Sequence, residues 1–228
     1  MRDKVYVILL LALVACSPLA SLDETSAKGT AYEVSVTSPR PVDENTISIA
    51  IAVDTSGSMV GEKIKELKRA MYGTIEKFGS YKGKRLEVGL YEFASHTETL
   101  VPMGTFNPQA LRNAVDGLGT GGNTGIGRAL AYAERELDAS ATGVRNILLL
   151  TDGENTSGRS PEEVLAYIAD TNRESGDAYT SVYVIGFDMD ASYFAPMASL
   201  GAMVEPSAKG QLIEVMVGNI KRMVEAEP

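Results

Sequence analysis

From Thr46 onward, the chain alternates short runs of aliphatic residues with longer stretches in which apolar residues recur every three or four positions. Runs of the first kind are typical of buried strands, and stretches of the second kind are typical of amphipathic helices. Strands that alternate with helices predict a parallel sheet with helices on both faces. We therefore expect one α/β domain, doubly wound, with a mostly parallel central sheet of about six strands.

The strands are expected in the segments richest in aliphatic and aromatic residues: 47–53, 86–93, 98–101, 145–151, 180–186 and 202–205. So little chain separates 86–93 from 98–101 that these two strands are expected to pair in antiparallel fashion, because a parallel connection needs a long crossover. Helices are expected at 61–78, 108–115, 126–137 and 211–225, after a capping box at 160–163, and from a cap at Asp190 to about residue 200.

The N-terminus carries the pattern of an export signal. Basic residues within 1–4 precede an apolar run, 5–15, that is too short to span a bilayer comfortably. The run ends in the sequence LVAC, which resembles the lipobox of bacterial lipoproteins, where the cysteine is lipidated and becomes the first residue. The resemblance implies a signal peptide over 1–15 and a lipid on Cys16. An ordinary secretory signal with an incidental cysteine is the alternative.

Residues 16–45 are rich in Ser, Thr, Pro, Ala and charge, and only 32–36 alternates as a strand would. We expect a flexible linker here, with a span on the order of 30 Å, followed by the domain at 46–228. Lipidation of Cys16 would then place the domain in the bacterial cell envelope. The expected location is the outer membrane or a periplasm-facing surface of a diderm, with the cell surface as an alternative.

Composition and charge exclude several classes of protein. The hydrophobic fraction of 44% is enough to form a core, and the single cysteine rules out a disulfide within the chain. Lys and Arg number 21 against 30 Asp and Glu, which gives a formal net charge of -9. Because this charge repels phosphate backbones, nucleic acid is not an expected partner.

Polar side chains follow two of the predicted strands at the point where each strand ends. The segment 54–58, with the sequence DTSGS, follows the first strand, and Asp152 follows the strand at 145–151. A glycine-rich loop at 119–125 carries Thr124. Ligands of open parallel sheets bind beyond the carboxyl ends of the strands. Carboxylates and hydroxyls gathered there, without His or thiolate, suit a hard divalent cation such as Mg²⁺.

Each of these residues also has an ordinary structural interpretation. The two serines could cap the helix that follows them, Thr124 could cap the next helix, and Asp152 could anchor a turn. Those roles together would leave Asp54 and Asp152 near one another without a counter-charge, which is unfavourable unless a cation or proton intervenes. We therefore predict a metal site.

The chain order Asp-x-Ser-x-Ser, then Thr, then Asp resembles the metal-ion-dependent adhesion site of von Willebrand factor type A (VWA) domains and integrin I domains. The resemblance extends over about 45–225 and implies the Rossmann-like VWA fold. Every position of the pattern is filled, by Asp54, Ser56, Ser58, Thr124 and Asp152. In the family, the serine hydroxyls bind the ion, the threonine binds it when a ligand is engaged, and the aspartates act mostly through water. One coordination position stays open for an acidic side chain of a partner.

The resemblance implies a lipid-anchored, divalent-cation-dependent protein-binding module, for adhesion or complex assembly, that grips a Glu or Asp of a protein partner. Mg²⁺ is the expected cation, with Mn²⁺ and Ca²⁺ as alternatives. We expect no catalytic residues and no enzymatic activity. A glycine-rich run at 117–122 matches a dinucleotide fingerprint but follows a helix-like stretch rather than a strand. The lone His96 lies in a turn with no nucleophile to activate.

Two alternatives stay open. An Asp after the first strand of a doubly wound sheet is also where Mg²⁺-dependent phosphohydrolases place their nucleophile. One common arrangement of such enzymes needs a second Asp where this chain has Ser56, and a well-placed lysine for the phosphate is not evident. The other alternative is an envelope scaffold with a vestigial metal site.

Overall fold

The structure is a computed structural model, and it describes residues 43–140, 142–175 and 178–225. The predicted signal peptide, the lipobox with Cys16 and most of the predicted linker lie outside these described residues. Among the helices of the described ranges, none is both long enough and apolar enough to cross a membrane.

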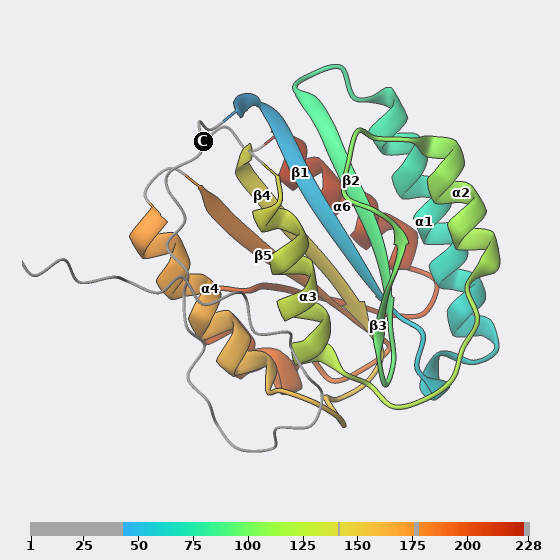
Figure 1. Ribbon diagram of the computed structural model, residues 1–228. Coiled ribbons are helices and arrows are strands. Elements are labelled where there is room, and N and C mark those ends of the chain that lie inside the picture. The colour runs from blue at the N-terminus through green and yellow to red at the C-terminus, as the bar shows by residue number, and fades with distance from the viewer. Residues whose placement is uncertain (1–42, 141, 176–177, 226–228) are drawn as a thin grey trace, which may run out of the picture. The chain divides into compact units, whose positions relative to one another are not determined.

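Six strands form one sheet in the order β3-β2-β1-β4-β5-β6. Figure 1 shows β1 at the centre, between β2 and β4. β3 pairs with β2 in antiparallel fashion, and every other pairing is parallel, as the hydrophobic pattern predicts. The strands are β1 (Asp43–Asp54), β2 (Arg85–Phe93), β3 (Thr97–Val101), β4 (Thr142–Thr151), β5 (Tyr179–Phe187) and β6 (Met203–Ser207).

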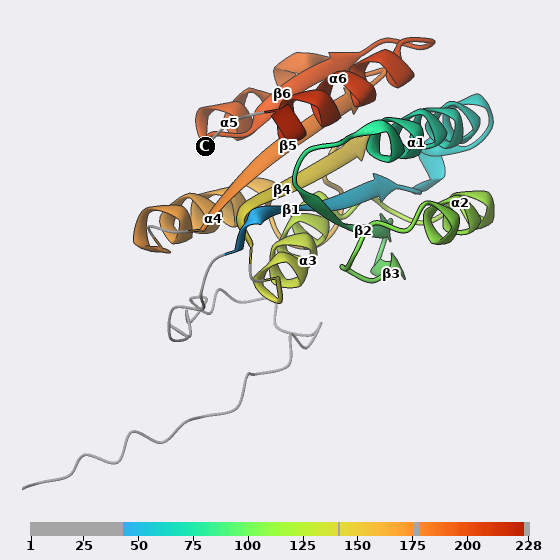
Figure 2. The ribbon, with the colours of Figure 1, turned by 90° about the horizontal axis from the view of Figure 1, so that it is seen from above.

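Helices cover both faces of the sheet, with α1 and α6 on one side and α3 and α4 on the other (Figure 2). This arrangement confirms the predicted doubly wound α/β fold. The helices are α1 (Glu62–Ser80), α2 (Pro108–Gly117), α3 (Ile126–Asp138), α4 (Pro161–Ser175), α5 (Ala195–Ser199) and α6 (Leu212–Glu225), and two 3-10 turns are η1 (Gly57–Met59) and η2 (Ala191–Phe194).

The two faces of β1 belong to two separate hydrophobic clusters, because successive side chains of a strand point to opposite faces. Ile49 and Ile51 pack in the cluster under α1, α2 and α6. Ala50 and Ala52 pack in the cluster under α3 and α4. All four are fully buried, which explains why this central strand is apolar at every position from Ile49 to Val53 rather than at every second one.

Two elements differ from the sequence prediction in informative ways. β1 begins at Asp43 rather than residue 47, because Asp43 pairs with Thr142 of β4 in the sheet, a contact that hydrophobicity does not signal. Asp190 does cap a helix, accepting from Ser192 N–H at 2.8 Å. That helix is divided into η2, which ends at Phe194, and α5, whose first turn contains Pro196, a residue with no N–H to continue the hydrogen-bond ladder from η2.

Candidate metal centre

The predicted site residues gather at the carboxyl ends of β1 and β4, which are neighbours in the sheet. Asp54 is the last residue of β1, and Asp152 directly follows the last residue of β4. Strand pairing therefore brings together two carboxylates that are far apart in the sequence. This edge of an open α/β sheet is where ligands usually bind.

Two loops meet over this edge through backbone hydrogen bonds. Gly121 N–H donates to the Thr55 carbonyl at 2.8 Å, in the segment that follows β1. Gly57 N–H donates in return to the Gly122 carbonyl at 3.1 Å. Gly122 has a φ of +82°, and a Cβ there would lie 2.8 Å from Ser95 Oγ. The loop that carries the predicted threonine is thus fixed against the serine-containing loop, and glycine is needed for the close approach.

Asp54 is fully buried, and both of its carboxylate oxygens accept hydrogen bonds. Oδ1 accepts from Ser56 N–H at 2.8 Å, and Oδ2 accepts from the Thr151 hydroxyl at 2.6 Å. Burial raises the pKa of Asp54 above its ordinary value, and the negative charge of Asp152 adds to the rise, whereas the hydrogen bonds from Ser56 and Thr151 oppose it. A nearby cation would favour the ionised form of this carboxyl.

A chain of hydroxyls links the two ends of the site. Ser56 Oγ lies 3.0 Å from Ser58 Oγ, and Ser58 Oγ donates to Asp152 Oδ1 at 2.6 Å. Ser56 and Asp152 are buried, whereas Ser58 is exposed. The chain of oxygens is therefore buried at both ends and reaches the surface of the domain at Ser58.

Thr124 completes the cluster from a third loop. Its N–H donates to Thr156 Oγ1 at 2.9 Å, and its carbonyl accepts from Thr156 N–H at 2.8 Å, so its backbone is held in place. A Cβ added to Gly153 would lie 3.5 Å from Thr124 Oγ1 and 3.7 Å from Ser58 Oγ. The two hydroxyls thus face the same small space, which the absent side chain of Gly153 leaves free.

The hydroxyls of the site are not used as helix caps. The N-cap residue of α1 is Gly61 and that of α3 is Gly125, and neither makes a side-chain capping bond. Ser56 precedes η1 and makes no side-chain capping bond there. The structure therefore differs from the capping interpretation of these residues and brings all five predicted residues together.

Lys63 lies in the site as well, although a well-placed lysine was not evident in the sequence. Its Nζ lies 2.6 Å from Asp152 Oδ2. Lys63 belongs to the first turn of α1. A signal was present in the sequence, because side chains at the start of a helix point back toward its N-terminus, and this helix begins directly after the DTSGS segment.

The donor set fits a hard divalent cation. Its donors are the oxygens of two carboxylates and three hydroxyls, the kind that Mg²⁺ prefers. No group of three or more His, Cys, Asp or Glu side chains gathers anywhere in the described residues. The chain itself already supplies part of the counter-charge, because the Lys63 ammonium lies against Asp152.

Other residues weighed in the sequence lie outside the cluster or have structural roles. The glycine-rich run at 117–122 connects α2 to α3 rather than a strand to a helix, so it lacks the context of a dinucleotide fingerprint. Asp190 is the cap described above, and its hydrogen bonds with Ser192 lower its pKa.

Known proteins are similar to this chain in sequence. The family model of the von Willebrand factor type A domain matches residues 48–213, which include all five predicted site residues. Human inter-alpha-trypsin inhibitor heavy chain H4 is 29% identical over 153 residues, which cover 64% of this chain and 16% of that protein. The uncharacterized protein YwmD of Bacillus subtilis is 30% identical over 176 residues, which cover 69% of this chain and 76% of that protein.

Solved structures share the fold. The pilus adhesin SpaC from Lactobacillus rhamnosus GG superposes with a TM-score of 0.63 at 17% sequence identity, covering 82% of this chain and 31% of that chain. At this identity the likeness shows the fold alone. The family match spans most of the chain and agrees with the sheet order and the strand-end loops. The chain therefore belongs to the von Willebrand factor type A domain family.

Proposed function

We propose that this protein is a divalent-cation-dependent protein-binding module, for adhesion or complex assembly. The observation that carries the proposal is the link from Ser56 through Ser58 to Asp152, with Oγ–Oγ and Oγ–Oδ1 distances of 3.0 Å and 2.6 Å. It joins oxygen donors from two strand ends into one cluster, which Thr124 approaches from a third loop. Mg²⁺ is the proposed cation, with Mn²⁺ and Ca²⁺ as alternatives.

The bound ion would supply a positive centre for a Glu or Asp carboxylate of a protein partner. The residues of this chain hold and shape that centre. The hydroxyls of Ser56, Ser58 and Thr124 are the proposed direct ligands, and the buried carboxylate of Asp54 supplies charge from behind them. Exposure of Ser58 supports access by a macromolecule from the outer side. That a relative of the same fold is a pilus adhesin also supports a binding role.

The structure favours binding over phosphohydrolysis. Lys63 does supply a lysine near the site, and the lack of one was an argument against a phosphohydrolase. Asp54 would be the nucleophile, but it is fully buried and both of its oxygens accept hydrogen bonds. A nucleophilic carboxylate must present a free oxygen to its substrate. Ser56 also still stands where a second aspartate is needed. We therefore propose a module without enzymatic activity.

We propose that the module is anchored in the bacterial cell envelope through a lipid on Cys16. The support is the lipobox-like sequence LVAC at 13–16 and the linker composition of the residues that follow. Several acyl chains on one cysteine give a stable anchor, because each buried methylene contributes about 0.8 kcal/mol. Metabolic labelling with a palmitate analogue tests this: the wild-type chain should be marked and Cys16→Ala should not. Equal labelling of both would refute the anchor.

Calorimetric titration of the full chain in detergent with Mg²⁺ and with Mn²⁺ tests the metal centre. The double variant Ser56→Ala/Ser58→Ala should bind either ion about tenfold or more weakly. Ser199→Ala is the matched control, because that serine lies at the end of α5 and donates only locally, to the Pro196 carbonyl at 2.7 Å. Wild-type protein without measurable affinity for either cation would instead favour a scaffold with a vestigial site.

Partner binding is tested by capture from envelope extract on the immobilised full chain. A protein retained with Mg²⁺ should be lost with a chelator and lost from Thr124→Ala, while the Ser199→Ala control retains it. Capture that is indifferent to the chelator and to Thr124→Ala would contradict a cation-dependent mode of binding.

A further inference from the structure

The ion pair between Lys63 and Asp152 differs from the lysine pairs on the surface. The side chain of Lys63 is 27% exposed and that of Asp152 is 0% exposed, with 2.6 Å between Nζ and Oδ2. Lys65, two residues further along α1, pairs with Glu62 at 2.8 Å with both side chains more than half exposed, at 63% and 58%. Water screens the second pair much more strongly than the first. The electrostatic attraction is therefore stronger in the Lys63–Asp152 pair than in the Lys65–Glu62 pair.

The position of Lys63 is unfavourable without its partner. It is the second residue of α1, and a positive charge in the first turn of a helix is repelled by the positive end of the helix dipole. The contact with Asp152 offsets that repulsion. The placement of the ammonium is thus explained by the carboxylate at the site and not by the helix that carries it.

Both oxygens of Asp152 are engaged by other residues of the chain. Oδ1 accepts from Ser58 and Oδ2 accepts from Lys63. A divalent cation that uses the charge of Asp152, directly or through water, therefore meets the ammonium of Lys63 at the same carboxylate. Two positive groups that share one carboxylate in a partly buried site repel one another strongly, because the effective dielectric constant there is far below that of water.

We propose that Lys63 is a tethered counter-ion of the metal centre, which neutralises Asp152 when no ion is bound and competes with the divalent cation for that carboxylate. The inference rests on the proposed function, because it requires that the site binds a cation, and it goes further by naming the residue that limits the affinity. Cation binding releases the Lys63 ammonium from Asp152. The same lysine stabilises the domain when no ion is bound, because it compensates the negative charge of Asp152, which would otherwise repel the Asp54 carboxylate.

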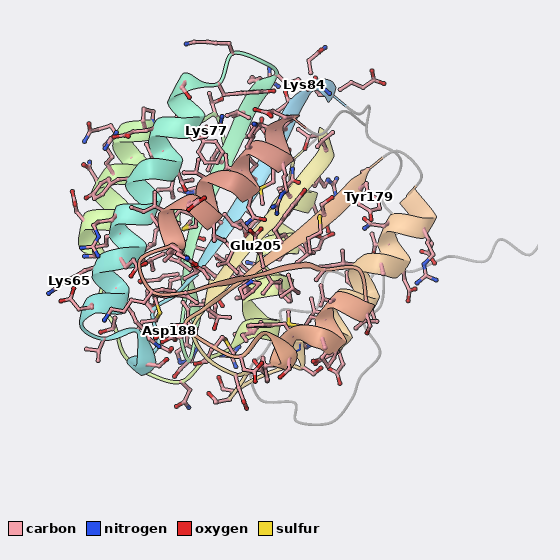
Figure 3. The ribbon with its side chains drawn as sticks, turned by 180° about the vertical axis from the view of Figure 1, so that it is seen from behind. Lys65, Lys77, Lys84, Tyr179, Asp188 and Glu205 are labelled. Carbon is pink, nitrogen blue, oxygen red and sulfur yellow. The ribbon has the colours of Figure 1, made fainter. Side chains whose placement is uncertain are left out.

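The first test compares Lys63→Met with Lys65→Met in the full chain. Lys65 is a matched control because it lies on the same helix and loses the same charge, yet its side chain projects from α1 away from the sheet (Figure 3). By titration calorimetry, Lys63→Met should bind Mn²⁺ about tenfold more tightly than wild type, and Lys65→Met should stay within about twofold. In a chelator, Lys63→Met should also melt at a lower temperature than Lys65→Met.

The outcomes separate the two proposals. Equal affinity in Lys63→Met and Lys65→Met, or weaker binding by Lys63→Met, would overturn the counter-ion role while leaving the proposed function intact. If wild type and both variants all fail to bind a cation, the proposed function falls and the counter-ion role falls with it.

A second test uses only the wild-type chain, so it does not depend on how a variant folds. Lysine acetylation by acetic anhydride is measured by mass spectrometry with Mn²⁺ and with a chelator, and Lys65 serves as the internal reference. Lys63 should react several times faster relative to Lys65 when Mn²⁺ is present, because the released ammonium is more accessible. An unchanged Lys63-to-Lys65 ratio would overturn the proposal.

Discussion

Thr151, the last residue of β4, donates its hydroxyl to Asp54 Oδ2, the last residue of β1, at 2.6 Å. Thr151 is fully buried, and the other oxygen of Asp54 is held by Ser56 N–H. The orientation of the Asp54 carboxylate is therefore held by the end of β4 and by the loop that follows β1. The loop that carries Ser56 and Ser58 begins directly after this fixed carboxylate.

Replacing Thr151 by valine should weaken the domain, because the change keeps the shape of the side chain and removes its hydroxyl. The buried oxygen of Asp54 loses a donor, which costs about 1–3 kcal/mol. Urea unfolding of the full chain measures the effect. Thr99→Val is the control, since Thr99 is exposed on β3 and bonds only to the Tyr132 hydroxyl, and its cost should stay below about 0.5 kcal/mol. Equal costs would contradict the role of Thr151.

A methyl group on Gly153 should disturb the cation site more than the fold. The added Cβ would lie at ordinary contact distance, 3.5 Å from Thr124 Oγ1 and 3.7 Å from Ser58 Oγ, in the space that both hydroxyls face. Gly153→Ala should therefore bind Mn²⁺ about tenfold more weakly by calorimetry. Gly79→Ala on α1, where an added Cβ meets nothing within 4 Å, should bind it as wild type does. Unchanged affinity in Gly153→Ala would show that the hydroxyls do not act together.

Cation binding should raise the stability of the domain by mass action. A ligand present at about 100 times its Kd stabilises the folded state by about 2.7 kcal/mol. Thermal unfolding with Mg²⁺ and with a chelator should therefore give different midpoints for the wild type and the same midpoint for Ser56→Ala/Ser58→Ala. A shift of equal size in the double variant would place the stabilising ion elsewhere.

The stability of the domain should depend on pH through Glu134, a buried residue of α3. Burial, aided by the negative charge of Asp138, raises the pKa of Glu134 to about 7, although the Thr180 hydroxyl and Arg145 oppose the rise. The folded state then binds a proton between about pH 4.5 and 7 that the unfolded state has lost. The contribution of this group to stability is therefore present at low pH and is lost as pH rises through about 7.

Glu134→Gln tests this dependence, because the amide cannot ionise. The advantage of the variant over wild type in urea unfolding should grow by an amount on the order of 2 kcal/mol between pH 5 and pH 8. Glu76→Gln, an exposed substitution on α1, should show no such growth. Parallel pH profiles for wild type and Glu134→Gln would contradict the expectation.

Much of the fold was predictable because the central strands consist mainly of aliphatic residues, a pattern typical of buried strands. The residues of β1 are buried on both faces, so Ile49 and Ile51 alternate with small alanines and not with polar residues. The ends of strands were harder to predict. β1 extends to Asp43 because that residue pairs with Thr142 of β4, and such a contact depends on a partner that lies far away in the sequence.

The candidate site was predictable to the level of its oxygen donors, because parallel strands bring their carboxyl ends to one edge of the sheet. The partners that orient those donors were not predictable. Thr151 was assigned to the strand alone, since nothing local shows that its hydroxyl meets Asp54. Lys63 was missed because the helix was predicted from its buried apolar positions, and that pattern does not single out a lysine at the start of the helix, although its place directly after the DTSGS segment was a signal.

The paired backbone hydrogen bonds between Gly121 and Thr55 and between Gly57 and Gly122 have a consequence for the speed of ion exchange. Loops that are already fastened to one another lose little conformational entropy when they bind. Arrival of the ion should then be limited by removal of its own hydration water, and Mn²⁺, which sheds water faster than Mg²⁺, should exchange faster at the same site.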